Sequence, residues 1–339
     1  MKKARYLLGL LLAAVFLYLF LRNIELQQVW TVISRGNPYW LLACLFLSVF
    51  NYYVRALRWR YFFLPIKKTK IWNLFTTTVI GFATNTLLPA KIGEMVRPYL
   101  LGTKENIGRS AALATVVVER MFDSLSILLL LVVYLFFLVD ARQLKPEAAS
   151  LLDDLSKAGL IVFLGIIALT IFLYYLKSKP VLLKKLFNKL DAVLPARFAH
   201  SLEGILDSFT EGLSILHDGK ILITISYWSI LFWILICAGV WAGVRAYVPD
   251  FPFTGTFLIM ILLAIGIAVP TPGAVGSYHF ACKISLTRFF GVPDAEAAAV
   301  ALVTHFLAFV PITILGTIFI WREGLTAAKL TTLAEKPQT

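Results

Sequence analysis

The chain has 339 residues, of which 59% are hydrophobic and 15% are charged, and its formal net charge is +13. A soluble globular domain has about half apolar and a quarter charged residues, so the composition excludes an ordinary soluble protein. Several apolar runs reach the roughly 20 residues that are needed to cross a bilayer. We therefore predict an all-α polytopic membrane protein. We attribute its excess of basic residues to cytoplasmic loops and anionic lipid headgroups, and we expect no nucleic-acid partner.

The first half of the chain begins with two predicted spans separated by a surface helix. Basic residues at 2–5 precede an apolar run at 6–21, which we interpret as a retained first helix with a cytoplasmic N-terminus. A short amphipathic helix is expected at 26–33 on the outer surface. A second span from residue 38 ends at six cations within 55–70, so this end is placed in the cytoplasm.

A broken hairpin is expected next, at 71–101, followed by a third span at 107–139. Pro89 and Gly93 interrupt this region near its middle. Proline removes a backbone donor and clashes with the preceding helical turn, and a broken backbone at membrane depth persists only inside protein or beside water. We therefore predict that the chain enters the membrane from the cytoplasm here and returns to the same side.

The second half repeats this order of elements from the opposite side of the membrane. The predicted elements are a span at 158–176, amphipathic cytoplasmic surface helices at 177–217, a span at 221–248, a broken hairpin at 253–290 and a last span at 294–321. Its hairpin breaks at the same Pro-x-x-x-Gly spacing as the first, 183 residues further on. The residues expected to interrupt the helices are Pro89 and Gly93 in the first hairpin and Pro270, Pro272, Gly273 and Gly276 in the second.

These elements amount to about six full spans and two re-entrant hairpins, eight hydrophobic segments in all, within a single membrane domain. The halves, about 1–140 and 158–322, are predicted to be inverted repeats, an arrangement that is typical of secondary transporters. In this topology 23 cations lie inside, eight lie outside and Arg120 lies in the membrane. The excess inside favours this orientation, with both termini in the cytoplasm.

Charged residues near the first break indicate a site for an anionic group. Past each break a new helix starts near the bilayer midplane, and the free N–H groups at a helix start bind anions such as phosphate. Lys91 and Arg97 lie close to this site in the sequence. Alternatively, proline and glycine only shape a packed hairpin, Glu94 caps its second helix, and both cations extend to the cytoplasmic surface.

A second group of charged residues lies midway along the third span. Glu119 and Asp123 share a helix face, and Arg120 is within reach of Asp123. A charge at a helix centre costs roughly 2.5–3.5 kcal/mol. The three residues therefore form either a self-neutralising group that locks helices together or a polar path for a headgroup or a proton. His279 and His305 occupy comparable places in the second half, as candidate binding groups or as satisfied polar residues.

Motifs of enzymes and of metal sites are absent from the sequence. It contains no Gly-rich phosphate loop, no Cys-x-x-Cys, no Gly-x-Ser-x-Gly and no His-Glu-x-x-His. Cys44, Cys237 and Cys282 stand singly in apolar segments, which favours a packing role over a disulfide framework. We expect neither catalysis nor a metal or other cofactor.

Four motifs, in order along the chain, resemble those of a known family. They are Arg55-Ala-Leu-Arg58-Trp59-Arg60, Leu88-Pro89-Ala-Lys-Ile-Gly93-Glu94 with Arg97, Glu119-Arg120 with Asp123, and Pro270-Thr-Pro272-Gly273-Ala-Val-Gly276. The set resembles the flippase-like family, which is the membrane domain of lysylphosphatidylglycerol synthases and its stand-alone relatives. The resemblance implies a protein of the cytoplasmic membrane that moves a lipid between leaflets. Relatives often carry a carboxylate where this chain has His279, and the soluble aminoacyl-transferase domain is missing, so lysyl transfer is not implied.

The sequence therefore predicts a lipid translocase for an anionic phospholipid or an isoprenoid-phosphate lipid. Alternatives are a secondary transporter of a small water-soluble anion, an integral-membrane transferase, or an accessory subunit of a lipid-modifying or glycosyl-transfer system. As partners we expect membrane lipids with anionic headgroups, and a second copy of the chain or a lipid-modifying enzyme is left open. The candidate headgroup-binding residues are Arg55, Arg58, Lys91, Glu94, Arg97, Glu119, Arg120, Asp123, His279 and His305.

Overall fold

The structure is a computed structural model, which describes residues 2–22, 24–88, 91–138 and 218–335, together with 153–154, 157–161, 163–165, 167–168 and 171. All regular secondary structure in these residues is helical, which confirms the all-α class. The surface helices expected at 177–217 and the first proline of the hairpin breaks, Pro89, lie outside the described residues.

Four helices of the described part are long and apolar enough to cross a membrane, which confirms a multi-pass membrane protein. They are α3 (Pro38–Phe63), α6 with its π-helical end η2 (Arg109–Val133 and Tyr134–Leu138), α10 (Gly219–Arg245) and α13 (Asp294–Arg322). α1 (Lys2–Leu21) joined to α2 (Leu26–Ser34) would make a fifth, across a bend of 81°. The count of six full spans therefore stays a prediction.

Capping residues explain where two of these spans begin. Asn37 precedes α3, and its side-chain oxygen accepts a hydrogen bond from the backbone N–H of Tyr39 at 3.0 Å. Pro38 occupies the first helical position, where its missing N–H leaves no partner unsatisfied. Asp218 caps α10 in the same way, accepting from the N–H of Lys220 at 3.0 Å.

Two shorter helices, α4 (Ile71–Leu87) and α5 (Gly93–Glu105), occupy the region of the first predicted break. They pack against each other where two glycines meet. A Cβ atom added to Gly93 would lie only 1.9 Å from the carbonyl oxygen of Gly81, so no side chain fits between the two backbones. The interruption between α4 and α5 surrounds Pro89, and its re-entrant course in a bilayer stays a prediction.

The second predicted break separates α11 (Gly255–Ala268) from α12 (Ser277–Phe290), with the short 3-10 helix η4 (Pro272–Ala274) between them. Ala274 has a positive φ of 56°, and Lys91, 183 residues earlier, has a φ of 52°. Residues other than glycine rarely adopt this left-handed conformation. The two breaks thus share an uncommon backbone feature as well as the spacing of proline and glycine.

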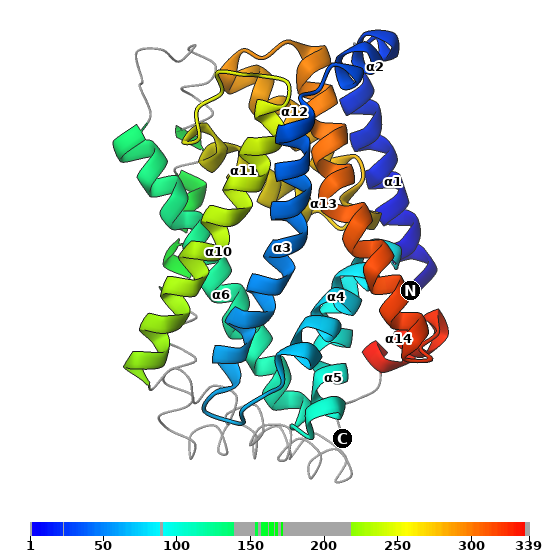
Figure 1. Cartoon of the computed structure of the whole chain (residues 1–339), viewed down its shortest axis with the longest axis vertical. Coiled ribbons are helices and arrows are strands. Elements are labelled where there is room, and N and C mark those ends of the chain that lie inside the picture. The colour runs from blue at the N-terminus through cyan, green and yellow to red at the C-terminus, as the bar shows by residue number, and fades with distance from the viewer. Residues whose placement is uncertain are drawn as a thin grey trace.

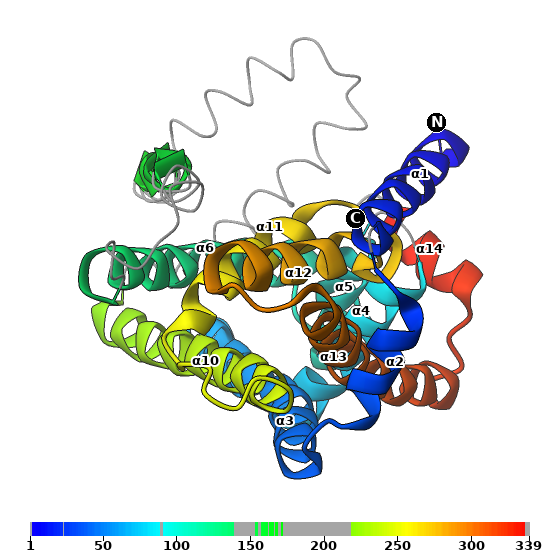
Figure 2. The same ribbon diagram turned by 90° about the horizontal axis from the view of Figure 1, so that it is seen from above.

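The helices of the two halves pack against one another in matching pairs. α3 lies along α10, and Figures 1 and 2 show these two helices side by side. α4 packs on α13 and α11 packs on α6, while α5 contacts α6 and α12 contacts α13. The breaks meet as well, because η4 packs on α4 and a Cβ atom added to Gly273 would lie 3.3 Å from Thr86.

The ends of the helices fall at two levels of the molecule. In Figure 1 the turn from α3 to α4 lies at the lower end and α2 lies at the upper end. The start of α1 and the short helix α14 (Ala327–Glu335) both lie in the lower half, on the side of the basic turn after α3. The matching helix pairs and their breaks occupy the region between these levels, where the candidate site is found.

Candidate functional site

The buried charged residues of the predicted site come from three helices. Arg55 and Arg58 lie one turn apart on α3, Glu119 and Asp123 lie one turn apart on α6, and Arg97 lies on α5. Residues three or four positions apart share a helix face. Arg58, Arg97 and Glu119 are at most 1% exposed, so their charges are removed from water.

Glu119 is the common partner of four guanidinium groups. Its Oε1 atom lies 3.0 Å from Nη2 of Arg58, 3.1 Å from Nη2 of Arg120 and 3.3 Å from Nη1 of Arg55. Its Oε2 atom lies 2.9 Å from Nη1 of Arg97. A single carboxylate therefore joins α3, α5 and α6, and it offsets part of the cost of burying the arginines.

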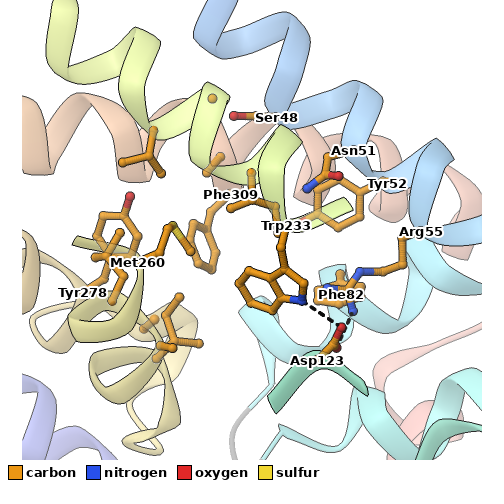
Figure 3. Close-up of a pocket in the computed structure, with 18 of the residues that line it drawn as sticks. Ser48, Asn51, Tyr52, Arg55, Phe82, Asp123, Trp233, Met260, Tyr278 and Phe309 are labelled. Atoms are coloured by element: carbon orange, nitrogen blue, oxygen red, sulfur yellow. Dashed lines mark hydrogen bonds and ion pairs between the residues drawn. The ribbon is translucent and has the colours of Figure 1, made fainter. Parts of the chain in front are cut away.

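Asp123 is held by groups from α3, α6 and α10. Its Oδ1 atom lies 2.6 Å from Nη1 of Arg58. The same atom accepts a hydrogen bond of 3.3 Å from the indole Nε1 of Trp233, as Figure 3 shows. Its Oδ2 atom lies 3.4 Å from Nη2 of Arg120, which confirms the reach that was expected along α6. Asp123 thus extends the charged group to α10 in the second half of the chain.

Aromatic rings cover the guanidinium groups of this cluster. The Cζ atom of Arg97 lies 3.6 Å from the centre of a ring of Trp59, and those of Arg55 and Arg58 each lie 4.5 Å from the ring centre of Phe232. A cation over the face of an aromatic ring is attracted by the electrons of that ring, more strongly where water is excluded. Ion pairs and rings together therefore stabilise the charges inside an apolar helix bundle.

The charged cluster does not neutralise itself. Its members are Arg55, Arg58, Arg97 and Arg120, with the carboxylates Glu94, Glu119 and Asp123, where Glu94 joins through a contact of 3.9 Å to Nε of Arg120. Four cations face three anions, and Lys91 adds one more cation at the same cavity. The cluster therefore keeps a formal excess of positive charge, while Glu119 also joins three helices, as the alternative of a group that locks helices together expects. The choice between a structural role and a polar path stays a prediction.

Lys91 connects the first break to the second. Its ammonium donates a hydrogen bond of 2.7 Å to the backbone oxygen of Ile267 and one of 3.3 Å to that of Ala268, at the C-terminal end of α11. The last carbonyl groups of a helix lack partners and carry partial negative charge, so a cation is stabilising there. Lys91 and the buried Arg97 thus lie within the helix bundle, unlike the alternative that extends both to the cytoplasmic surface.

A cavity of about 500 Å³ adjoins the cluster and lies between the two broken helix pairs. Its charged side is formed by Arg55, Lys91, Glu94, Arg120 and Asp123. Figure 3 shows Arg55, Asp123 and Trp233 at this side, with Met260, Tyr278 and Phe309 at the other. The apolar residues that the second half contributes to the wall include Leu235, Ile236, Val240, Met260, Leu263, Ala264 and Ile267. The cavity therefore combines a cationic side with an apolar wall.

His279 and His305 lie beside the second break and do not line this cavity. Nδ1 of His279 accepts a hydrogen bond of 3.2 Å from the N–H of Gly276, and Nε2 of His305 lies 2.9 Å from the backbone oxygen of Gly273. The two rings are in contact, with centres 4.5 Å apart. In this structure both histidines hold the backbone of the break, whereas a role in binding a headgroup remains a prediction for them.

Two asparagines outside the predicted site complete the polar side of the cavity. Asn51 lies on α3, one turn before Arg55, and Asn85 lies near the end of α4. The Oδ1 atom of each is buried without a hydrogen-bond partner, which costs about 1–3 kcal/mol. The four-residue spacing from Arg55 is a signal that identifies Asn51, whereas nothing in the sequence places Asn85 beside it.

The fold and this site define a polytopic, all-α membrane protein with a positively charged cavity between two interrupted helix pairs. Comparison with known proteins identifies the family within this class. The chain belongs to the family of the lysylphosphatidylglycerol synthase transmembrane region, whose family model matches residues 6–316. This match confirms the resemblance that the four sequence motifs carry.

Relatives of the chain include UPF0104 membrane proteins and a glycosyltransferase, all from archaea. A UPF0104 membrane protein of Methanocaldococcus jannaschii is 24% identical over 323 residues, which cover 91% of this chain and 92% of that protein. A second protein of this kind from the same organism is 28% identical over 249 residues, or 70% and 92% of the two chains. The glycosyltransferase AglD of Haloferax volcanii is 21% identical over 88% of this chain and 51% of its own length. No solved structure matches the chain.

Proposed function

We propose that the protein moves an anionic lipid, either a phospholipid or an isoprenoid-phosphate lipid, between the leaflets of the cytoplasmic membrane. The observation that carries this proposal is the cavity, which joins a cluster of excess positive charge to an apolar wall. A phosphate supplies the negative charge that the cluster lacks, and arginine binds phosphate oxygens through pairs of N–H donors. Catalysis is not part of the proposal, and neither is a cofactor.

The two sides of the cavity fit the two parts of a lipid. Arg55 and Arg120 face the cavity from α3 and α6, and Lys91 faces it from the first break. These three side chains can surround a phosphate, while the apolar wall from α10 and α11 can cover the carbons next to it. A small water-soluble anion would leave that apolar wall without a partner, so the cavity favours a lipid over the alternative of a soluble anion.

We also propose that the two halves are inverted repeats that expose the cavity to each leaflet in turn, as in secondary transporters. Three observations support this. The breaks share the Pro-x-x-x-Gly spacing, Lys91 and Ala274 have the same left-handed backbone, and the helix contacts match. The contact of α4 with α13 corresponds to that of α11 with α6, and the contact of α5 with α6 corresponds to that of α12 with α13.

Lipid exchange in proteoliposomes tests the proposed function. The purified full chain is reconstituted into vesicles that carry a fluorescent phosphatidylglycerol, and a membrane-impermeant quencher reports how much of it reaches the outer leaflet. We expect exchange to be faster than in protein-free vesicles, and we expect the Arg97→Ala variant to lose this acceleration. The absence of exchange across a panel of anionic phospholipids and polyprenyl phosphates would overturn the proposal.

The glycosyltransferase among the relatives favours one second candidate, an accessory subunit of a lipid-modifying or glycosyl-transfer system. The chain covers 51% of AglD, so the activity that AglD is named for is not assigned to it. As an accessory subunit, the chain would present a lipid-linked sugar to a separate transferase. A comparison of lipid-linked sugars in cells with and without the protein tests this candidate, which predicts a changed glycan pool even where purified protein exchanges no lipid.

A further inference from the structure

A histidine caps the helix that follows the second break. The N–H of Gly276, the residue before α12, donates a hydrogen bond of 3.2 Å to Nδ1 of His279, the third residue of this helix. A side chain at this position often accepts from the residue before the helix, and it is usually glutamate or glutamine. Here the acceptor is a ring nitrogen, which can accept a hydrogen bond only while it carries no proton.

His305 holds the other side of the same break. Its Nε2 atom lies 2.9 Å from the backbone oxygen of Gly273. A carbonyl oxygen only accepts, so this nitrogen carries a hydrogen whether the ring is neutral or protonated. A proton added to His305 would leave its bond to the break in place. A proton added to Nδ1 of His279 would remove the bond from Gly276, so the two histidines respond differently to acid.

Aromatic side chains surround the two imidazole rings. The ring centre of His305 lies 4.4 Å from that of Phe309 and 5.1 Å from that of Tyr278. Figure 3 shows Tyr278 and Phe309 at one side of the cavity. On α1, the ring centre of Phe20 lies 5.3 Å from that of His279. The side chain of His279 is thus packed between the break and α1, and the residue is only 5% exposed.

Among the described residues, no carboxylate pairs with either histidine ring. α11 and η4 contain no titratable residue, and neither do α2 and α4, which pack on α13. Besides the histidines, the titratable groups around this region are Tyr278, Cys282, Cys237, the ion pair of Lys283 with Asp294, and Cys44, Tyr52 and Arg55 at the cavity. A positive charge on His279 would therefore lack a counter-charge while the break is closed.

We propose that His279 is a proton-binding site that controls the second break. While the break is closed, Nδ1 accepts from Gly276 and holds no proton. A proton taken up from water turns this acceptor into a donor, so the cap is lost and the start of α12 moves to where the charged ring reaches water. His305 stays neutral, because two charged rings with centres 4.5 Å apart would repel each other.

The consequence of this site is a cavity whose wall depends on pH. Gly273 and Ala274 belong to the break and line the cavity, so an opening of the break moves part of the cavity wall. The proposal goes beyond the proposed function, because it holds whatever the cavity binds. It gives the protein a means by which acid on one side of the membrane can favour one conformation.

Hydrogen exchange of backbone amides measures the opening of the break and needs no lipid. The full chain in detergent is followed through peptides that cover 270–281, from pH 7.5 to pH 5, and each rate is divided by the intrinsic rate at that pH. A histidine in water takes up its proton near about pH 6.5, and uptake of one proton changes an equilibrium by up to about tenfold for each unit of pH. We expect the corrected exchange to rise about 10- to 30-fold over this range.

Two glutamine variants and the first break serve as controls. Glutamine at 279 can accept from Gly276 but cannot titrate, so His279→Gln should keep slow exchange at pH 7.5 and lose the rise at pH 5. His305→Gln can still donate to the oxygen of Gly273, and it should keep the rise. The first break, within 84–97, contains no histidine, and its exchange should change less than about twofold.

Exchange at the second break that is the same at pH 7.5 and pH 5 in the wild-type chain would overturn the proposal, and this readout requires no variant. An equal rise at the first break would also overturn it, because it would indicate general unfolding by acid. Retention of the rise in His279→Gln, or its loss in His305→Gln, would remove His279 as the site. Since no lipid is present, a failure of leaflet exchange leaves this proposal standing, and a break without pH dependence leaves the proposed function standing.

Discussion

At the scale of single residues, Glu119 is the carboxylate of the charged cluster that pairs with all four of its arginines. Removing an ion from water into a protein interior costs several kcal/mol. Glu119 partly compensates this cost for Arg58 and Arg97, which are almost fully buried and each lie 3.0 Å or less from one of its oxygens. It does not line the cavity, so we expect it to fix the positions of the arginines rather than to touch a substrate.

The Glu119→Gln variant should therefore be strongly destabilised. Glutamine keeps the shape of the side chain but leaves the buried guanidinium groups without their counter-charge, which costs about 3–5 kcal/mol when one partner of a buried pair is removed. We expect a lower midpoint of thermal unfolding in detergent and a loss of lipid exchange. Glu25→Gln, at an exposed glutamate before α2, is the matched control. A Glu119→Gln protein as stable as wild type would contradict the compensating role of this carboxylate.

Substitution of Arg120 should impair lipid exchange while leaving the stability of the protein nearly unchanged. Its side chain is 40% exposed and lines the cavity, in contrast to that of Arg58, which is fully buried and does not line it. Removal of Arg120 leaves Glu119 and Asp123 with their contacts to Arg58, so neither buried carboxylate becomes unpaired. We expect Arg120→Gln to change the unfolding midpoint little and to slow lipid exchange about tenfold or more, because a hydrogen bond to a charged group is lost.

The matched comparison for Arg120→Gln is Arg58→Gln. The same substitution at the fully buried arginine leaves Asp123 without its 2.6 Å contact, so we expect it to unfold the protein at a lower temperature than Arg120→Gln does. Thermal unfolding and lipid exchange are measured on the same preparations. If the two variants lost stability equally, the separation between a binding arginine and a structural one would be wrong.

At the scale of elements, the sequence predicts the positions of the helices better than their contacts. The last span was expected at 294–321 and is Asp294–Arg322 in the structure, and the interruption around Pro89 separates α4 from α5. Proline and glycine determine these boundaries locally, so the sequence is sufficient. The contact of Lys91 with the backbone of Ile267 joins residues 176 positions apart, and no local pattern determines it.

The histidines illustrate the same limit within one element. Their spacing from the second break indicated a place near the site, and the structure puts both rings against the backbone of that break. Sequence spacing gives the face of a helix but not what that face meets. For this reason His279 and His305 were grouped with Arg97 and Glu119 in the prediction, although they contact different parts of the molecule.

The crossing of α4 and α5 depends on the absence of a side chain at Gly93. A methyl group added there would meet the carbonyl oxygen of Gly81 at 1.9 Å, and backbone atoms cannot move aside as a flexible side chain does. We expect Gly93→Ala to destabilise the protein by about 1–3 kcal/mol, the usual cost of overpacking. It should also slow lipid exchange, because α5 carries Arg97. Thermal unfolding and the exchange assay measure the two effects.

The control for Gly93→Ala is Gly219→Ala, at the first residue of α10. A Cβ atom added to Gly219 meets nothing within 4 Å in the described part of the chain. Alanine also favours a helix over glycine by about 1 kcal/mol, so this variant should be at least as stable as wild type. Equal stability of the two alanine variants would show that α4 and α5 can move apart without a cost in stability.

At the scale of the whole molecule, the two halves are alike in packing and unlike in chemistry. Matching helices make matching contacts, yet the first half supplies the charged and carboxamide groups of the cavity and the second half supplies most of its apolar wall. In the proposed inverted arrangement, this one polar side offers a single headgroup site to both leaflets in turn. The orientation of this arrangement in the membrane then decides which residues face the cytoplasm.

Labelling of a cysteine introduced at either end of α3 tests this orientation. The excess of cations at one end predicts that Lys68, in the exposed turn after α3, faces the cytoplasm and that Arg35, in the exposed turn after α2, faces outward. A membrane-impermeant maleimide should label the Arg35→Cys variant in right-side-out vesicles and the Lys68→Cys variant in inside-out vesicles. Wild type is the control, since Cys44, Cys237 and Cys282 are at most 2% exposed.

The two labelling outcomes have different consequences for the proposed topology. Labelling in the reverse vesicles would invert the orientation and place the basic turn outside, against the rule that basic loops remain on the cytoplasmic side. Labelling of both variants from one side would be more severe, because α3 lies between the two turns and must cross the bilayer if they face opposite compartments. It would contradict the proposed alternating access of inverted halves, on which the proposed movement of a lipid between leaflets depends.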